Sequence, residues 1–242
     1  MEIYFSNHQN KNQQLFLDLD DTKHIVKVLR HKINDEIVVV FQEQKYLTKI
    51  LTLSPNVICQ IIEPLQQNNE LPIKVTLVLA LLKEQKFDLI IQKAVELGVY
   101  RIIPIQLQRC VSIVTNKIDQ KINRWQNIAK AAAKQANRNI IPEVTSVIKK
   151  IPDLKQYQSA KNFLAYELTY DNKQFYDWSK DLIDIDSLTI VIGPEGGISA
   201  SELSNFKDLN FTNISLGPTI LRAETAPLYF LSIVNYHSLL KD

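Results

Sequence analysis

The pattern of hydrophobic and polar residues changes near residue 70 of this 242-residue chain. Before that point, short β-branched runs such as "EIVVVF", "YLTKILTL" and "NVICQIIEP" alternate with turns, and only "DTKHIVKVLRHK" has helical character. This pattern is typical of a small antiparallel β domain or barrel. The polar stretch "LQQNNELP" (65–72) predicts a linker. We therefore expect one domain at residues 1–70 and a second at 71–242.

The second part of the chain alternates apolar runs with helical patterns. "IKVTLVLALL" (73–82) is continuously apolar, as expected of a strand buried on both faces. Strand and helix alternation predicts an α/β domain with a mostly parallel sheet. Gly98 is an expected helix C-cap, and Ser199 with Glu202 forms an expected capping box. Further strands are predicted at 101–107, 161–168, 188–193 and 212–217, and helices at 86–98, 116–139, 199–208 and 224–240.

Composition and charge narrow the class of protein. The chain is 45% hydrophobic and 22% charged, with a net charge of +2, so overall charge gives no preference for nucleic acid. Cys59 and Cys110 form neither a C-x-x-C pair nor a zinc pattern, which favours a reducing compartment. The chain shows no secretory leader pattern and no apolar run near the roughly 20 residues that span a bilayer. We expect a cytoplasmic protein without a metal site or a membrane partner.

Four of the five glycines lie in two loops that follow predicted strands, "GPEGG" after Ile192 and "LGPTILRAET" near Leu216. Ligands of open α/β sheets bind at the carboxyl ends of strands, and glycine lets the backbone approach them closely. Gly-Pro after a strand can also be a simple turn. Neither loop matches a dinucleotide fingerprint or a P-loop, and neither contains Lys. We expect a ligand held by backbone groups, with an adenine in an apolar slot.

Five stretches in chain order resemble one known family. They are "HIVKVLRHKINDEIVVV" (24–40), "QKAVELGVYRIIPIQLQRC" (92–110), "KQANRNIIPEV" (134–144), "IGPEGGIS" (192–199) and "SLGPTILRAETA" (215–226). Together they resemble the SPOUT superfamily of RNA methyltransferases and, within it, the bacterial 16S rRNA (uracil-N3) methyltransferase family. The resemblance implies a SPOUT α/β domain with a deep trefoil knot, preceded by a small PUA-like β-barrel. It also implies S-adenosylmethionine as methyl donor, 16S rRNA of the small ribosomal subunit as substrate, and a homodimer.

The chain departs from the family pattern at four positions. Thr219 stands where the family has Arg, so any role of that side chain is in doubt. Asn34 replaces a Gly and can still adopt the left-handed conformation of a turn. Lys134 and Ala136 replace Glu and Ser of the third stretch.

The resemblance and the chemistry of methyl transfer together suggest the site residues. Arg222 is the expected cation that stabilises the uridine anion, and Glu224 would orient Arg222 or accept the proton. Alternatively, Arg222 and Glu224 form only a salt bridge at a helix start, and Glu195 is a turn residue that faces water. Ile192, Ile220 and Leu221 would shape the adenine slot. The expected donor-binding residues are Ile192, Gly193, Pro194, Glu195, Gly196, Leu216, Gly217, Ile220 and Leu221.

Basic residues suggest where RNA binds. The helix at 116–139 has a basic side with only Asp119 opposing it, which would neutralise phosphates or simply be a solvated face. The expected RNA contacts are Lys23, Lys27, Arg30, Arg109 and Arg138.

Two other functions stay open from the sequence. One is a related SPOUT enzyme that methylates the ribose 2′-hydroxyl or another base. The other is a non-catalytic RNA-binding protein of ribosome assembly that has lost donor binding. The β-rich first 70 residues favour the uridine enzyme, and donor binding would separate it from the assembly protein.

Overall fold

The protein is described by a computed structural model that covers residues 2–166, 178–182 and 184–238. Its contacts divide the chain into two compact units. The first unit is Met1–Glu70 with Ala133–Ile141, and the second is Leu71–Ala132 with Pro142–Asp242. The first unit thus includes a segment, residues 133–141, that the sequence pattern placed in the second part of the chain.

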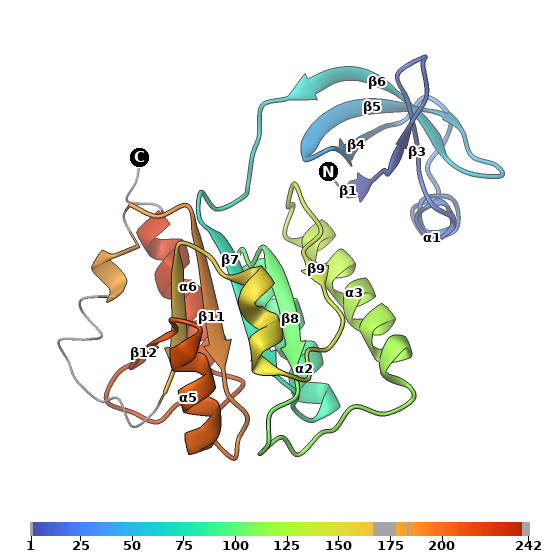
Figure 1. Ribbon diagram of the computed structural model, residues 1–242. Coiled ribbons are helices and arrows are strands. Elements are labelled where there is room, and N and C mark those ends of the chain that lie inside the picture. The colour runs from blue at the N-terminus through green and yellow to red at the C-terminus, as the bar shows by residue number, and fades with distance from the viewer. Residues whose placement is uncertain (1, 167–177, 183, 239–242) are drawn as a thin grey trace. The chain divides into compact units, whose positions relative to one another are not determined.

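The first unit is built on a curved β-sheet (Figure 1). The strand order is β1-β4-β5-β6-β3-β2, and every described pair is antiparallel except β1 with β4. Its elements are β1 (Ile3–Phe5), β2 (His8–Gln9), β3 (Gln14–Phe16), α1 (Leu19–Lys23), the π-helical turn η1 (His24–Leu29), β4 (Glu36–Phe41), β5 (Gln44–Thr52) and β6 (Ile58–Leu65).

The predicted β domain is therefore present, although the described residues do not close it into a barrel. The strands β1 and β2 lie at the two ends of the sheet, and no pairing joins them within the part of the chain that is described. A core of apolar side chains, including Tyr4, Leu15 and Val39, packs against one face of the sheet. Asn34 adopts a φ of 77°, which confirms the expected left-handed turn before β4.

The second unit contains the predicted parallel sheet. Its strand order is β12-β10-β11-β7-β8-β9, and all described pairs are parallel. The strands are β7 (Lys74–Ala80), β8 (Arg101–Ile105), β9 (Glu143–Val144), β10 (Lys161–Ala165), β11 (Ser187–Ile192) and β12 (Thr212–Ile214). The apolar run at 73–82 becomes β7, which lies between β8 and β11 and is buried from Val75 to Ala80. Because β12, β10 and β11 are neighbours, their carboxyl ends meet at one edge.

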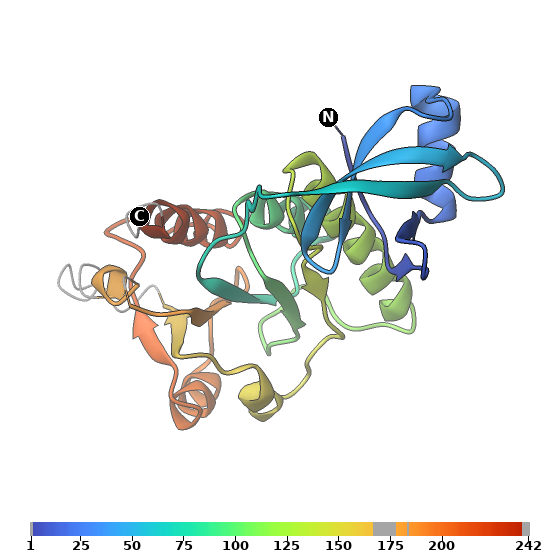
Figure 2. The ribbon, with the colours of Figure 1, turned by 90° about the horizontal axis from the view of Figure 1, so that it is seen from above.

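Helices cover both faces of this sheet. Figures 1 and 2 show α2 (Glu84–Glu96) and α6 (Ala226–Ser238) on one face, and α5 (Ala200–Asp208) with the 3₁₀ helix η2 (Ile151–Tyr157) on the other. The long predicted helix is α3 (Ile118–Gln135). No helix among the described residues is long and apolar enough to cross a membrane.

The predicted helix signals are observed. Gly98 has a φ of +95° just after α2, and Ser199 with Glu202 makes a reciprocal capping box at the start of α5. The sequence did not predict η2, whose residues Ile151 and Leu154 pack into the core beneath α5. The ends of the predicted strand at 161–168 and helix at 224–240 lie partly outside the described residues.

Candidate active site

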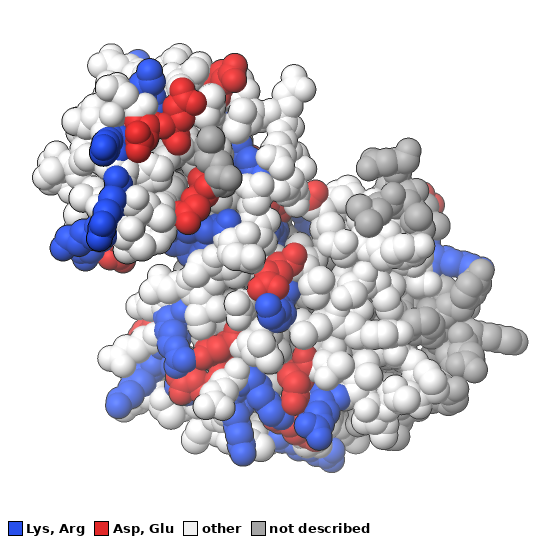
Figure 3. Space-filling model, turned by 180° about the vertical axis from the view of Figure 1, so that it is seen from behind, with Lys and Arg blue, Asp and Glu red and all other residues white. Residues whose placement is uncertain are grey.

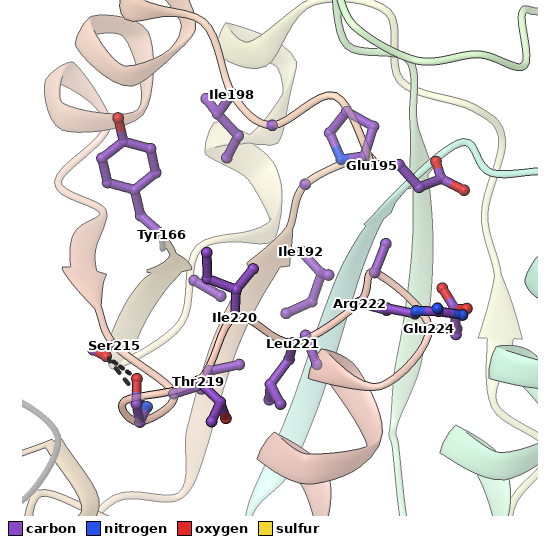
Figure 4. A pocket seen from close by; sticks show the side chains of 18 of the residues that line it. Tyr166, Ile192, Glu195, Ile198, Ser215, Thr219, Ile220, Leu221, Arg222 and Glu224 are labelled. Atoms are coloured by element: carbon purple, nitrogen blue, oxygen red, sulfur yellow. Dashed lines mark hydrogen bonds between the residues drawn. The ribbon is translucent and has the colours of Figure 1, made fainter. Parts of the chain in front are cut away.

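A pocket of about 480 Å³ lies at the carboxyl ends of β10, β11 and β12 (Figure 4). Ala165 ends β10 and Tyr166 follows it, while Ile192 ends β11 and the lining residues 193–195, 197 and 198 follow it. Residues 215–224 follow β12, and Lys86 reaches the pocket from the first turn of α2. This volume falls in the range of small-molecule and cofactor sites. The position is the one expected for a ligand of an open parallel sheet.

The loop after β11 is a tight turn whose shape depends on glycine. The N–H of Gly197 donates to the carbonyl of Pro194 at 2.9 Å, and Gly197 has a φ of 72°. A Cβ on Gly193 would come within 2.9 Å of the Ile198 side chain. Glycine therefore lets this loop turn sharply over the end of β11.

Gly217 gives the second loop its shape. It has a φ of +117°, and a Cβ placed on it would meet nothing within 4 Å. The Ser215 hydroxyl donates to the Gly217 carbonyl at 3.1 Å and accepts from the Gly217 N–H at 3.2 Å (Figure 4). The backbone conformation, rather than lack of space, is what requires glycine here.

Eight of the nine expected donor-binding residues line the pocket, and Gly196 does not. A Cβ on Gly196 would lie 2.8 Å from the Arg109 Cβ and 3.0 Å from the Arg109 carbonyl oxygen. The Arg109 guanidinium also donates to the Gly196 carbonyl at 3.1 Å. Because Gly196 has no side chain, the loop after β8 packs closely against the loop after β11. Gly196 therefore helps to position a loop that lines the pocket.

A cluster of three charged side chains, Lys86, Glu195 and Glu224, lies at one side of the pocket. The Lys86 ammonium lies 3.2 Å from Glu195 Oε1 and 3.1 Å from Glu224 Oε2. These contacts, the one with Glu224 first, raise the pKa of Lys86. The pKa of Glu224 is lowered by its own backbone N–H and then by Lys86. Lys86 is therefore protonated and Glu224 ionised at neutral pH.

Arg222 lines the same pocket and is exposed. Figure 4 shows its side chain beside that of Glu224. The alternative Arg222–Glu224 salt bridge is not observed, because Glu224 pairs with Lys86 instead. Within residues 2–166, 178–182 and 184–238, the Arg222 guanidinium forms no ion pair, so the cation is available to a ligand.

The rest of the pocket wall is largely apolar. Ile192 is buried at its base, and Ile220 is 83% exposed at its edge. Trp178 stacks on Phe230, and its indole N–H donates to the Ser215 carbonyl at 3.2 Å. This hydrogen bond helps to hold the loop after β12 in place. This apolar wall matches the expected adenine slot in kind.

Sequence reasoning missed several residues of the site. Lys86 comes from a helix that is 109 residues away from Glu195 in the chain, and no local motif indicates that they meet. Tyr166 and Ser215 could have been found, because each directly follows a strand whose carboxyl end faces the pocket. Ile198 directly follows the "GPEGG" motif and lies inside the stretch 192–199 that resembles the family.

The residues expected to bind RNA fall into different environments. Lys23, Lys27 and Arg30 are exposed on α1 and η1 of the first unit. Arg109 is exposed and also binds Gly196. Arg138, however, is 3% exposed and pairs with Glu70 inside the first unit. Its guanidinium is not presented to solvent, so we do not include it in an RNA-binding surface.

Asp119 is the acidic residue within the predicted helix 116–139, but acidic residues of other elements also pair with its basic side. Arg124 pairs with Glu84 and Asp88, and Lys134 pairs with Asp21. Figure 3 shows acidic side chains lying among the basic ones on the face in view. Lys134, which departs from the family pattern, thus has Asp21 as its acidic partner in the folded unit.

Among the residues with a described position, no group of three or more His, Cys, Asp or Glu side chains could hold a metal ion. Cys59 and Cys110 are free, and burial raises the pKa of both thiols.

Known proteins resemble this chain over most of its length. A family model described as "RNA methyltransferase domain" matches residues 69–235. Ribosomal RNA small subunit methyltransferase E of Mesomycoplasma hyopneumoniae is 34% identical over 96% of this chain and 98% of its own. The enzyme of that name from Bacillus subtilis is 36% identical over 90% and 88%.

A crystal structure of a ribosomal RNA small subunit methyltransferase E from Neisseria gonorrhoeae, bound to S-adenosyl methionine, has a TM-score of 0.82 at 25% identity. It covers 96% of this chain and 95% of its own. These similarities agree with the two glycine loops and the pocket that they form. The chain therefore belongs to the family of ribosomal RNA small subunit methyltransferases E.

Proposed function

We propose that this protein transfers a methyl group from S-adenosylmethionine to N3 of a uridine in the 16S rRNA of the small ribosomal subunit. The observation that carries the proposal is the convergence on one pocket of both glycine loops and of Arg222, which has no ion pair among the described residues. The names of the relatives support the rRNA substrate, and the bound ligand of the Neisseria protein supports the donor.

The pocket residues fit such a donor. An adenine would lie against the apolar wall formed by Ile192, Ile220 and Leu221, with the loop backbones around it. The open space beside Gly217 leaves room for the donor against that loop. Glu195 and Glu224 place negative charge where a ligand carrying a sulfonium and an ammonium would be favoured.

The bound donor would supply an activated methyl group on a sulfonium. Methylation would require the uridine N3–H to give up its proton, here to solvent, and N3 to take the methyl carbon while sulfur keeps the electron pair of the C–S bond. Arg222 would donate to a carbonyl oxygen of the uracil ring and stabilise the negative charge that develops there. Holding the two reactants in line would provide much of the rate enhancement.

Glu224 suits an electrostatic role better than that of proton acceptor. Its lowered pKa makes the carboxylate a weak base, and its ion pair is with Lys86. We therefore propose that the Glu224 carboxylate provides negative charge beside the cations Arg222 and Lys86. Solvent, rather than Glu224, would accept the proton of uridine N3.

The first unit would supply part of the RNA contacts. The side chains of Lys23, Lys27 and Arg30 are exposed there, and their positive charges can neutralise the phosphates of RNA. We propose that this unit is the family's PUA-like domain, supported by its curved, largely antiparallel sheet. The family resemblance likewise supports a trefoil knot at the pocket loops, a homodimer and a cytoplasmic location.

The test uses small subunits from cells that lack this protein. The purified protein and S-adenosylmethionine labelled in the methyl group are added, and the rRNA is digested to nucleosides for mass spectrometry. Label in 3-methyluridine is the expected result. Label in a ribose-methylated nucleoside would overturn the uridine assignment but keep the donor. Absence of both label and donor binding would overturn the enzymatic function.

A further inference from the structure

Lys86 brings together two loops that have no other described ion pair between them. Glu195 belongs to the loop after β11, and Glu224 belongs to the loop that leads from β12 into α6. Both carboxylates lie within hydrogen-bonding distance of the same ammonium, which comes from the first turn of α2. Without that cation, the two neighbouring carboxylates would repel each other.

The three side chains are sheltered enough for this attraction to matter. Lys86, Glu195 and Glu224 are 34%, 30% and 20% exposed in their side chains. Pairs in this environment are screened less than pairs that are fully in solvent. Both loops also line the pocket, so a change in their separation alters the site directly.

We propose that Lys86 is a positioning residue for methyl transfer, which holds Glu195 and Glu224 together so that both loops grip one donor molecule. This role rests on the proposed function, since it assumes that the pocket binds S-adenosylmethionine. A different role for Lys86 would be direct contact with the donor's carboxylate, because an ammonium has three N–H donors and Glu195 Oε1 accepts one hydrogen bond.

The test compares donor affinity among variants of the full chain by isothermal titration calorimetry. Lys86→Met removes the charge and keeps the length of the side chain. Lys86→Met combined with Glu195→Gln removes the cation together with one of the two repelling carboxylates. Lys86→Arg keeps the charge. Lys83→Met is the matched control, because Lys83 is an exposed neighbour at the start of the same helix and does not line the pocket.

Lys86→Met should weaken donor binding about tenfold, a typical size for coupling between contacting charged groups. Adding Glu195→Gln should restore most of that loss, Lys86→Arg should stay near the wild type, and Lys83→Met should match it. The kcat at saturating donor should change less than the KM for donor, because the reacting atoms are untouched.

Two results would overturn the role of Lys86 alone. Either Lys86→Met binds the donor like the wild type, or the added Glu195→Gln gives no recovery, which would indicate direct contact or general destabilisation. If the wild-type protein itself bound no donor, both the proposed function and this role would be wrong.

Discussion

Each unit contains a cluster of charged side chains. The two clusters are made of similar residue types but have different roles. In the first unit, Arg138 is 3% exposed and donates to Glu70, which also accepts from the N–H groups of Asn139 and Ile140. Lys45, fully buried, donates to the Asn137 carbonyl at 2.7 Å, and burial lowers its pKa. In this cluster the charged groups find partners within the unit.

The pocket cluster of Lys86, Glu195 and Glu224 differs in two respects. Its side chains are 20% to 34% exposed, and the exposed Arg222 beside it has no ion-pair partner among the described residues. A buried charge that loses its partner destabilises a fold, whereas a cation without an ion-pair partner beside a pocket is available to a ligand. Both clusters contain residues of the family motifs, so motif membership alone does not distinguish the two uses.

The largest effect is expected from breaking the buried cluster. Glu70→Gln leaves the Arg138 guanidinium buried without a counter-charge, which should lower the stability of the first unit by about 3 kcal/mol. Hydrogen exchange of the β4 and β5 amides in urea measures this loss. The matched control is Glu63→Gln, an exposed position on β6. If exchange in Glu70→Gln equals that of the control, the cluster does not stabilise the unit.

The second effect should fall on rate rather than on stability. Arg222→Ala should reduce kcat about a hundredfold, the size expected for loss of one group that stabilises developing charge. The unfolding midpoint and the donor affinity should stay unchanged, because Arg222 has no described ion-pair partner to lose. Single-turnover methylation and thermal unfolding measure the two quantities, with Lys207→Ala on α5 as control. If Arg222→Ala lowered the unfolding midpoint but methylated at the wild-type rate, Arg222 would serve stability rather than catalysis, and the proposed difference between the two clusters would be wrong.

A smaller effect is expected from the support behind the pocket. Gly196→Ala places a Cβ at 2.8 Å from the Arg109 Cβ and at 3.0 Å from its carbonyl oxygen. Relieving such overlap costs about 1–3 kcal/mol, part of which should appear as weaker donor binding. Calorimetric titration with donor tests this, and Asn205→Ala on the exposed side of α5 is the control. Unchanged donor binding would show that the pocket does not depend on this close contact.

The smallest effect is expected from pH. The lowered pKa of Glu224 makes its contribution complete above the ordinary value of 4.5 and lost only as pH falls through the folded pKa. The raised pKa of Lys86 makes its contribution complete below 10.5 and lost only above that value.

Wild-type donor affinity should therefore change by less than about twofold between about pH 5.5 and 7, below the range in which the donor's own amino group titrates. Among the described residues, other charged or titratable groups near the cluster include Arg222, Tyr166 on the pocket wall, and the Cys110 thiol, whose pKa burial raises. A clear titration of donor affinity within this range would indicate an ionising group in the pocket that the cluster does not explain.

The parallel sheet, its helices and most of the pocket could be predicted from the sequence because they depend on local signals. Continuous apolar runs predicted the central strands, and glycines at the ends of strands predicted the two loops of the pocket. Lys86 and Glu70 could not be found in this way. Glu70 lies in the stretch read as a linker, yet it binds residues 68 to 70 positions later, and no local pattern encodes such a contact.

The central claim is that the donor binds between the two glycine loops at the carboxyl ends of β11 and β12. Hydrogen exchange of the full chain, followed by mass spectrometry with and without S-adenosylmethionine, tests it most directly. The account predicts slower exchange at residues 193–198 and 215–224 when the donor is present, with little change in β4 and β5. Slower exchange confined to other segments, or no change at saturating donor, would contradict it.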